Sequence, residues 1–349
     1  MVNSKNRFDR LFLDFFQEQF SDRSNMEISN FEELTTGWDT EVYSFKISYT
    51  ENLQRKQANW VLKLFGSMNH LEKARNEFQT MKNLYSLGYP VPRVILLDSG
   101  NSSFKTPAIV MEKISGRLFW FDFQKTTGSK KNELITLYCQ LLLNVHNLDW
   151  KRFATDPELR THGDSEIWIK LELAAAQKVM DEHLFHDLQP VLDWLNDLKS
   201  EIPPVELSLI HGDYHSYNIM LRNSDNKPVV IDWGRSRVGD FRYDLAWTLL
   251  VESTYGELEM RQRILDEYQR LDNTGINTIE YFDVLAIFWR LFYIVLTITR
   301  GAKTLGYRKG VESYMKQRPY HLRRVYDLLQ ERTGLELVSV EKLLSFLDN

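Results

Sequence analysis

The spacing of apolar positions divides the chain into a strand-rich first part and a helix-rich second part. Between residues 27 and 107, short runs of β-branched and aromatic residues surround a single stretch with helical spacing. From about residue 130 onward helical spacing dominates, apart from a strand-like patch at residues 210–233. Strands followed by helices are typical of an α+β fold. The pattern predicts a small sheet-rich lobe at residues 1–112 and a larger, mostly helical lobe at residues 113–349.

The first lobe contains the clearest strand signals. The runs VYSFKI (residues 42–47) and NWVLKLF (residues 59–65) flank a polar stretch and predict a pair of antiparallel strands. Residues 71–88 have apolar side chains at helical spacing and end in a glycine, which predicts the main helix of this lobe. Two further strands are expected within residues 91–100 and 107–116, and the second ends in a turn that joins the lobes.

The composition narrows the classes of partner. Hydrophobic residues make up 43% and charged residues 26% of the 349 residues, a balance that allows a buried core. The formal net charge is −5 and the basic residues are dispersed, so no nucleic-acid partner is expected, and neutral or cationic substrates are favoured. The single cysteine, Cys139, excludes an intramolecular disulfide and a cysteine zinc cluster and fits a reducing cytoplasm.

No membrane segment is expected. Asp9 and Asp14 stand among the N-terminal apolar residues, so this segment lacks the uninterrupted apolar core of a signal peptide. Its apolar residues lie on one helical stripe, which predicts a helix at about residues 7–20. The most apolar later run, residues 284–298, contains Arg290 and is shorter than the roughly 20 residues of a membrane span. This run predicts a buried helix. The apolar residues of the N-terminal stripe are Phe8, Leu11, Phe12, Phe15 and Phe16.

The densest polar clusters accompany two apolar strands of the second part. The sequence LIHGDYHSYNIML lies in the segment 209–222, and PVVIDWG occupies residues 228–234. Phosphoryl transfer requires a carboxylate to orient and deprotonate the nucleophile, oxygen ligands for magnesium, and a cation on the phosphates. Asp213 is the candidate catalytic base, and Asn218 and Asp232 are the candidate Mg²⁺ ligands.

These motifs are shared with a known family. HGDYHSYN followed by VVIDW and GDFRYDLAW resembles the signature of aminoglycoside phosphotransferases and their choline-kinase-like relatives, and the resemblance extends from about residue 31 to residue 327. It implies a bilobal protein-kinase-like fold, ATP (or GTP) and Mg²⁺ as cofactors, and transfer of the γ-phosphate to a hydroxyl of a small molecule. Only seven residues separate Asp232 from Asp240, so the long activation segment that docks peptides in protein kinases is missing.

The resemblance also implies a phosphate-binding lysine on the third strand of the first lobe. Lys63 stands in that strand, although a strand lysine can also extend its ammonium into solvent without a specific function. Glu77 is the expected ion-pair partner from the following helix, because it lies beside the apolar face where an unpaired carboxylate is costly. Glu72, at the helix start, is the alternative partner.

The remaining nucleotide contacts are expected in two segments. A degenerate phosphate loop is expected in LTTGWDTEVY, and the adenine is expected against PAIVMEKISG. The phosphate-loop residues are Gly37, Thr36 and Thr40, and the adenine-site residues are Met111, Glu112, Lys113 and Ile114. A plain turn role for Gly37 and core packing for Met111 are the alternatives.

Other residues of the motif allow different functions. His211, Asp213 and His215 alternate as they would on one face of a strand, which also suits a metal-dependent hydrolase. An inactive nucleotide-binding pseudokinase is a further alternative. Asp240 and Asp244 are expected to fix the loop and to cap the next helix.

The acceptor pocket is expected in the helical lobe. Trp168, Glu172 and Asp181 form a candidate cluster for a cationic substrate. Arg290 needs a partner if it is buried, and Asp240, Asp244 or Glu252 is expected to provide a carboxylate. The sequence leaves the acceptor open among aminoglycosides, amino alcohols, sugars and other metabolites, and it leaves the oligomeric state open.

Overall fold

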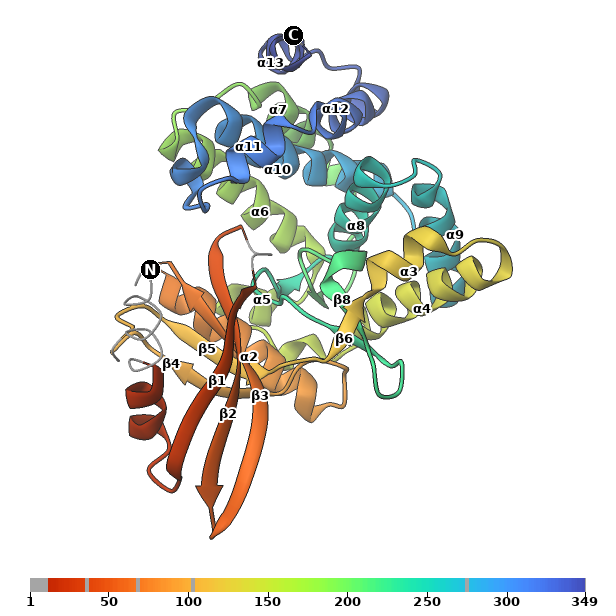
Figure 1. Cartoon of the computed structure of the whole chain (residues 1–349). Coiled ribbons are helices and arrows are strands. Elements are labelled where there is room, and N and C mark those ends of the chain that lie inside the picture. Colours follow the sequence, from red (N-terminus) through yellow and green to blue (C-terminus); the bar gives the residue numbers. More distant parts are fainter. Residues whose placement is uncertain (1–11, 35–37, 67–69, 102–103, 274–275, 349) are drawn as a thin grey trace. The chain divides into compact units, whose positions relative to one another are not determined.

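The computed structural model describes residues 12–34, 38–66, 70–101, 104–273 and 276–348 of the chain (Figure 1). Its contacts divide the chain into two compact units. The first unit comprises Met1–Arg117 and Met220–Gly234, and the second comprises Leu118–Ile219 and Arg235–Asn349. Antiparallel strands dominate the first unit and helices dominate the second, so the structure has the predicted α+β class.

The first unit is built on a five-stranded antiparallel sheet with the strand order β1-β2-β3-β5-β4. The predicted strand pair is confirmed, with Val42 of β2 opposite Lys63 of β3. The helix α2 (Leu71–Ser86) packs against β4 and β5, and the chain leaves it through Gly88 at a φ of 78°. The strands are β1 (Ser24–Leu34), β2 (Thr40–Glu51), β3 (Gln54–Phe65), β4 (Val94–Asp98) and β5 (Ala108–Glu112).

Aromatic side chains fill the core behind this sheet. Residues 12–19 are helical, as expected for part of the predicted N-terminal helix, whereas its first residues, Phe8 and Leu11 among them, lie outside the described part of the chain. Phe12, Phe15 and Phe16 are fully buried. Phe16 lies 5.3 Å from Phe45 and 5.6 Å from Trp60, measured between ring centroids, so the helix packs directly on β2 and β3.

Residues 220–234 belong to the first unit, although the sequence assigned them to the helical lobe. The strands β6 (Gly116–Leu118), β8 (Ile219–Arg222) and β9 (Pro228–Val230) form a sheet in the order β6-β8-β9. Arg222 pairs with Glu112 at 2.9 Å, and the Val230 N–H donates to the Pro90 carbonyl at 2.8 Å. These contacts with segments distant in sequence connect the two strands to the end of β5 and the exit from α2.

The second unit is a helical assembly with one short strand pair, β7 (Ser208–Ile210) with β10 (Arg237–Gly239). Its central helices, α8 and α10, pack against each other. The α-helices are α3 (Phe119–Lys125), α4 (Gly128–His146), α5 (Pro157–His162), α6 (Ser165–Glu182), α7 (Gln189–Leu198), α8 (Phe241–Tyr255), α9 (Met260–Asp272), α10 (Ile279–Arg300), α11 (Val311–Lys316), α12 (Pro319–Thr333) and α13 (Val338–Leu347).

The helix α10 is long and apolar enough to cross a membrane by length and composition, but 89% of its most apolar window is buried inside the unit. This burial agrees with the predicted buried helix. The partners expected for Arg290 were wrong. Its guanidinium donates to His321 Nε2 at 2.9 Å and to the Tyr255 hydroxyl at 2.5 Å. The carboxylates proposed for it from the sequence serve other groups, described below.

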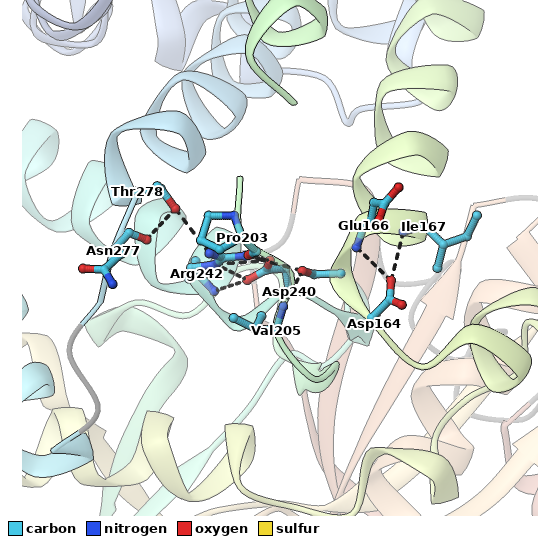
Figure 2. Close-up of polar contacts among 10 residues, drawn as sticks. Asp164, Glu166, Ile167, Pro203, Val205, Asp240, Arg242, Asn277 and Thr278 are labelled. Carbon is cyan, nitrogen blue, oxygen red and sulfur yellow. Dashed lines mark hydrogen bonds and ion pairs between the residues drawn. The ribbon is translucent and has the colours of Figure 1, made fainter. Parts of the chain in front are cut away.

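A buried ion pair fixes the start of α8 (Figure 2). Asp240 caps this helix by accepting from the Arg242 N–H, and its carboxylate pairs with the Arg242 guanidinium at 2.7 Å. The same guanidinium reaches the Pro203 carbonyl at 3.0 Å and the Thr278 hydroxyl, just before α10, at 3.2 Å. The predicted capping role of Asp240 is confirmed, and the network holds α8 in one position relative to its neighbours.

Candidate functional site

In the first unit, β3, α2 and the segment after β9 bring three charged groups together. The Lys63 ammonium donates to both carboxylate oxygens of Glu77, at 2.8 and 2.9 Å, and to Asp232 Oδ1 at 2.8 Å. The predicted ion pair between Lys63 and Glu77 is therefore present. The alternative partner, Glu72, is exposed and pairs with Arg75.

Burial strengthens the electrostatic interactions among the charged groups of this cluster. Glu77 is 1% exposed and Lys63 is 7% exposed. Burial alone would lower the pKa of Lys63, but the Asp232 and Glu77 carboxylates outweigh it and hold that pKa above its usual value. Burial raises the pKa of Glu77, against the attraction of Lys63. The lysine is therefore a fixed positive charge, while the Asp232 side chain, which is 49% exposed, also faces solvent.

The backbone at Asp232 has an uncommon conformation. Asp232 has a φ of 62°, in the left-handed region that non-glycine residues rarely adopt. The next residue, Trp233, is fully buried and anchors the turn by donating to the Val230 carbonyl at 3.1 Å. A Cβ on Gly234 would lie 3.1 Å from a Glu77 carboxylate oxygen, so a glycine at this position leaves room for the cluster.

Two residues of this cluster were not predicted. Asp39, which precedes β2, pairs with Lys73 of α2. Burial alone would raise the pKa of Asp39, but Lys73 outweighs it and holds the pKa below its usual value. The only sequence signal was the position of Asp39 within the proposed phosphate loop, between Gly37 and Thr40. Gly37 and Thr36 of that loop lie outside the described residues, and Thr40 is buried at the start of β2.

Part of the segment proposed to bind adenine already forms backbone hydrogen bonds with neighbouring residues of the first unit. The N–H of Glu112 donates to the Arg93 carbonyl, and the N–H of Lys113 donates to the Asn59 carbonyl. Met111 is 9% exposed and lines the buried side of β5. Of the backbone N–H groups of the expected adenine-site residues Glu112, Lys113 and Ile114, the first two are thus engaged. The Ile114 amide has no acceptor among the described residues.

The second unit holds the segment His211–Asn218, which contains Asp213. The Asp213 Oδ1 atom accepts from the Trp247 indole N–H at 2.9 Å, and the Asp213 N–H donates to His211 Nδ1 at 3.3 Å. His211 is fully buried, so its predicted supporting role agrees with the structure. Gly212 has a φ of 76°, and a Cβ there would lie 2.5 Å from the Arg235 carbonyl oxygen. A glycine is therefore required next to Asp213.

A polar stripe on α8 holds this segment. The Asp244 carboxylate accepts from the backbone N–H groups of His211 and Gly212, both at 2.8 Å. Thr248 donates to the Tyr214 carbonyl at 3.1 Å, and Glu252 accepts from the Ser216 N–H at 2.6 Å. The predicted role of Asp244 in fixing the loop is confirmed.

Three other residues of α8 that contact this segment were not predicted to hold the loop. Thr248 and Glu252 follow Asp244 at intervals of four residues, and Trp247 faces the same segment one position before Thr248. Helical spacing of buried polar residues within an apolar helix was the signal that could have identified Thr248 and Glu252.

Asn218 and His215 lie beside Asp213. The Asn218 amide nitrogen donates to the Asp213 carbonyl at 2.9 Å and lies 3.2 Å from His215 Nε2. Both contacts use the amide nitrogen, so neither occupies the amide oxygen, the atom that a magnesium ion requires. His215 Nε2 lies 3.8 Å from Asp213 Oδ1.

The alternation of His211, Asp213 and His215 does not produce a metal cluster. Within the described ranges, no group of three or more His, Cys, Asp or Glu side chains is arranged to hold a metal ion. The hydrolase alternative therefore lacks the site that motivated it.

The cluster proposed for a cationic substrate is also not formed. Trp168 is buried against Tyr243, with ring centroids 5.5 Å apart. The Glu172 carboxylate pairs with Arg237 at 3.1 Å and is thereby neutralised. Asp181 is exposed and contacts Gln177 on its own helix. No negatively charged pocket results from these three residues.

Comparison with known proteins identifies relatives of most of the chain. The model of the Phosphotransferase enzyme family (APH) matches residues 31–279. Acyl-CoA dehydrogenase family member 11 of Rattus norvegicus is 29% identical over 253 residues, which are 68% of this chain and 30% of that protein. The Homo sapiens protein of the same name is 27% identical over 209 residues, 58% of this chain and 26% of that protein. The chain thus spans less than a third of the curated relatives that it matches.

Solved structures support the fold at low sequence identity. A structure described as a putative aminoglycoside phosphotransferase from Ralstonia eutropha superposes with a TM-score of 0.63 at 15% identity, covering 91% of this chain and 97% of that one. An ethanolamine kinase from Plasmodium vivax gives 0.59 at 14% identity, with coverages of 91% and 87%. The ternary complex of APH(2'')-IIa with streptomycin and ATP gives 0.54 at 16%, with coverages of 88% and 95%. The bilobal protein-kinase-like fold predicted from the motifs is confirmed.

Proposed function

Because this chain belongs to the phosphotransferase enzyme family, we propose that it transfers the γ-phosphoryl group of ATP to a hydroxyl group of a small molecule. Solved relatives of the same fold support both halves of the proposal. One was crystallised with ATP and streptomycin, and another is an ethanolamine kinase. Others were solved with GDP, so GTP is a second candidate donor.

The observation that carries the proposal is the buried ammonium of Lys63 between Glu77 and Asp232. An ammonium held by a fully buried carboxylate keeps its charge and its direction, which is what a phosphate-binding lysine requires. In the proposal Lys63 binds the phosphates of the nucleotide. The half-exposed Asp232 carboxylate, which contacts Lys63, would be one of the groups that hold a magnesium ion.

The donor atoms fit magnesium. Mg²⁺ prefers oxygen ligands, and the half-exposed Asp232 carboxylate and the Asn218 amide oxygen are of this kind. We propose these two residues as its ligands. When bound, the ion would neutralise charge that develops on the phosphate oxygens.

Asp213 is the proposed catalytic base. Its carboxylate is 27% exposed, so an acceptor hydroxyl can reach it, and Trp247 fixes one of its oxygens. The carboxylate takes the proton of the acceptor hydroxyl while the acceptor oxygen bonds to the γ-phosphorus. The bond between that phosphorus and the β–γ bridging oxygen breaks, and ADP leaves with the bonding electron pair.

The proposal is tested with Asp213→Asn in a screen for ADP release over a panel of hydroxylated small molecules. Asparagine keeps an oxygen that can accept from Trp247 but is no base, so turnover should be lost while ATP affinity is retained. Asp193→Asn, on the surface of α7, is the matched control and should keep full turnover. Undiminished transfer in Asp213→Asn would refute the assignment. ATP binding without Asp213-dependent turnover on any acceptor would favour the pseudokinase instead.

A further inference from the structure

The guanidinium of Arg235 lies beside the proposed base in an aromatic setting. Its central carbon is 4.9 Å from the ring centroid of Tyr293 and 5.7 Å from that of Trp247, the residue that donates to Asp213. The Arg235 backbone packs against Gly212, the neighbour of Asp213. Arg235 is half-buried. All these residues belong to the second unit.

Among the described residues, the Arg235 guanidinium has no hydrogen-bond acceptor. Neighbouring arginines are satisfied: Arg237 pairs with Glu172, and Arg242 pairs with Asp240. A guanidinium carries five N–H donors in a planar fork, and leaving them without acceptors in a half-buried position is unfavourable. Burial alone would lower the pKa of Arg235, but Tyr293 and Asp213 outweigh it, so the group stays charged.

The surroundings of Arg235 offer a further donor to an anion. The Tyr293 hydroxyl has no hydrogen-bond partner among the described residues, and the ring of this residue is half-buried on α10. Glu172, a carboxylate of the predicted acceptor region, is already neutralised by Arg237.

We propose that the phosphate acceptor carries an anionic group and that the Arg235 guanidinium binds this group, with its hydroxyl directed to Asp213. The inference rests on the proposed phosphotransferase function and specifies its substrate class: a hydroxylated carboxylate or phosphate ester rather than an amino alcohol. Carboxylates and phosphates are the groups that match the fork of a guanidinium in two parallel hydrogen bonds.

The aromatic contacts hold the guanidinium without satisfying its N–H groups. Trp247 of α8 and Tyr293 of α10 present flat ring faces to the guanidinium. Such faces attract the cation but do not pair with its N–H donors in its own plane, so these donors remain for an anionic group. Arg235 is therefore a specificity-determining residue in this proposal, and Asp213 keeps the role of base.

The test uses a series of acceptors with one three-carbon hydroxylated skeleton and different charges. Glycerate and glycerol 3-phosphate are anionic, glyceramide is neutral, and 3-amino-1,2-propanediol is cationic. The full-length protein is assayed for Asp213-dependent ADP release, and binding of each compound is measured by calorimetry with ADP present. We expect the anionic compounds to exceed glyceramide by about 10- to 100-fold in kcat/KM or affinity, the range of a charge-assisted hydrogen bond.

Three variants separate the role of Arg235 from a structural one. Arg235→Gln should lower kcat/KM for the anionic acceptors much more than kcat/KM for glyceramide and so remove the preference for the anion, and Arg235→Lys should retain part of the preference. Arg237→Gln is the matched control, since it also removes a guanidinium from this segment but one that Glu172 already satisfies. This control should keep the preference even if the variant is less stable.

The outcomes are distinct. A response to glycerate but not to glycerol 3-phosphate, or the reverse, identifies the anion as a carboxylate or a phosphate ester and supports the proposal. Equal responses across the series, or a preference for the amine, overturn it while the phosphotransferase function stands. If Arg235→Gln lowers kcat/KM by the same factor for every acceptor, the proposal is also overturned, because the arginine would then act on the transferred phosphoryl group or on Asp213. No binding and no turnover with any compound counts against the anion site, and ADP release that persists in Asp213→Asn refutes the function itself.

Discussion

Replacing Trp247 with phenylalanine tests whether α8 positions the proposed catalytic base. The Trp247 indole N–H donates to Asp213 Oδ1 at 2.9 Å, and a phenyl ring keeps much of the aromatic packing without the donor. A hydrogen bond to a charged group contributes about 1.5–3 kcal/mol. If this contribution is lost mainly in the transition state, kcat falls by roughly 10- to 100-fold. ATP affinity should be unchanged, because Lys63 and Asp232 are not altered.

The chain offers a matched control for this change. Trp289 is also buried, but its indole N–H has no hydrogen-bond partner among the described residues. Trp289→Phe therefore makes the same reduction in ring size without removing a hydrogen bond, and both variants should lose stability through the smaller ring. Only Trp247→Phe should lose kcat. The assay is steady-state ADP release at saturating ATP and acceptor, with unfolding followed in urea.

Two results would refute this reasoning. Equal losses of kcat in Trp247→Phe and Trp289→Phe would assign the effect to packing rather than to the hydrogen bond. An unchanged kcat in Trp247→Phe would mean that the loop holds Asp213 without the indole. A rise in the KM for ATP with constant kcat would place the effect of the substitution on nucleotide binding.

Three further predictions test the contacts of Lys63, Gly212 and Asp244. Lys63→Met leaves the buried Glu77 carboxylate without its cation and should lower the free energy of unfolding in urea by about 3–5 kcal/mol. Adding Glu77→Leu should restore part of this stability but no activity. If the double variant recovers no stability, the pairing is contradicted. Gly212→Ala and Gly306→Ala both place alanine at a positive φ, 76° and 71°, but only the Cβ at position 212 would meet a backbone carbonyl oxygen, at 2.5 Å. Gly212→Ala should therefore lose more stability, and equal losses in the two variants would refute the steric argument. The variant Asp244→Asn tests how the stability of the fold depends on pH. Burial alone would raise the Asp244 pKa, but the hydrogen bond from a buried histidine and neighbouring groups outweigh it, and the folded-state pKa lies below 3.8. This carboxylate therefore stabilises the fold above pH 3.8, and the contribution is lost as the pH falls through the lower folded-state value. The asparagine variant should be less stable at neutral pH and should lose less stability on acidification, and an unchanged acid limb in the unfolding free energy would contradict this.

The ion pair of Lys63 with Glu77 could be predicted from the sequence. The family resemblance implied a lysine on the third strand, and Glu77 lies next to the apolar stripe of a helix, where an unpaired carboxylate is costly. Pairing of the strand with its neighbours then placed Lys63 within reach of Glu77. The left-handed conformation of Asp232 had no such local signal, because strain at one residue depends on the contacts of the residues around it.

The assignment of residues 220–234 was missed for a different reason. The segment follows β7 in sequence and carries motifs that the resemblance assigns to the helical lobe. Its location is decided by the Arg222 contact with Glu112 and by the hydrogen bond of Val230 with the Pro90 carbonyl, which join segments more than 100 residues apart. Neither contact has a periodic signature in the chain.

Arginine partners show most clearly where prediction from sequence ends. Arg237, Arg242 and Arg290 are all charged residues near apolar runs, and nothing in their local sequence separates them from Arg235. The fold supplies a glutamate to the first, an aspartate to the second, and a histidine with a tyrosine to the third. Arg235 receives aromatic faces and no hydrogen-bond acceptor among the described residues. The net charge of −5 favoured neutral or cationic acceptors, but a net charge averages over the whole surface. Recognition depends on the charges that remain unpaired beside the reacting group, and next to Asp213 that charge is positive.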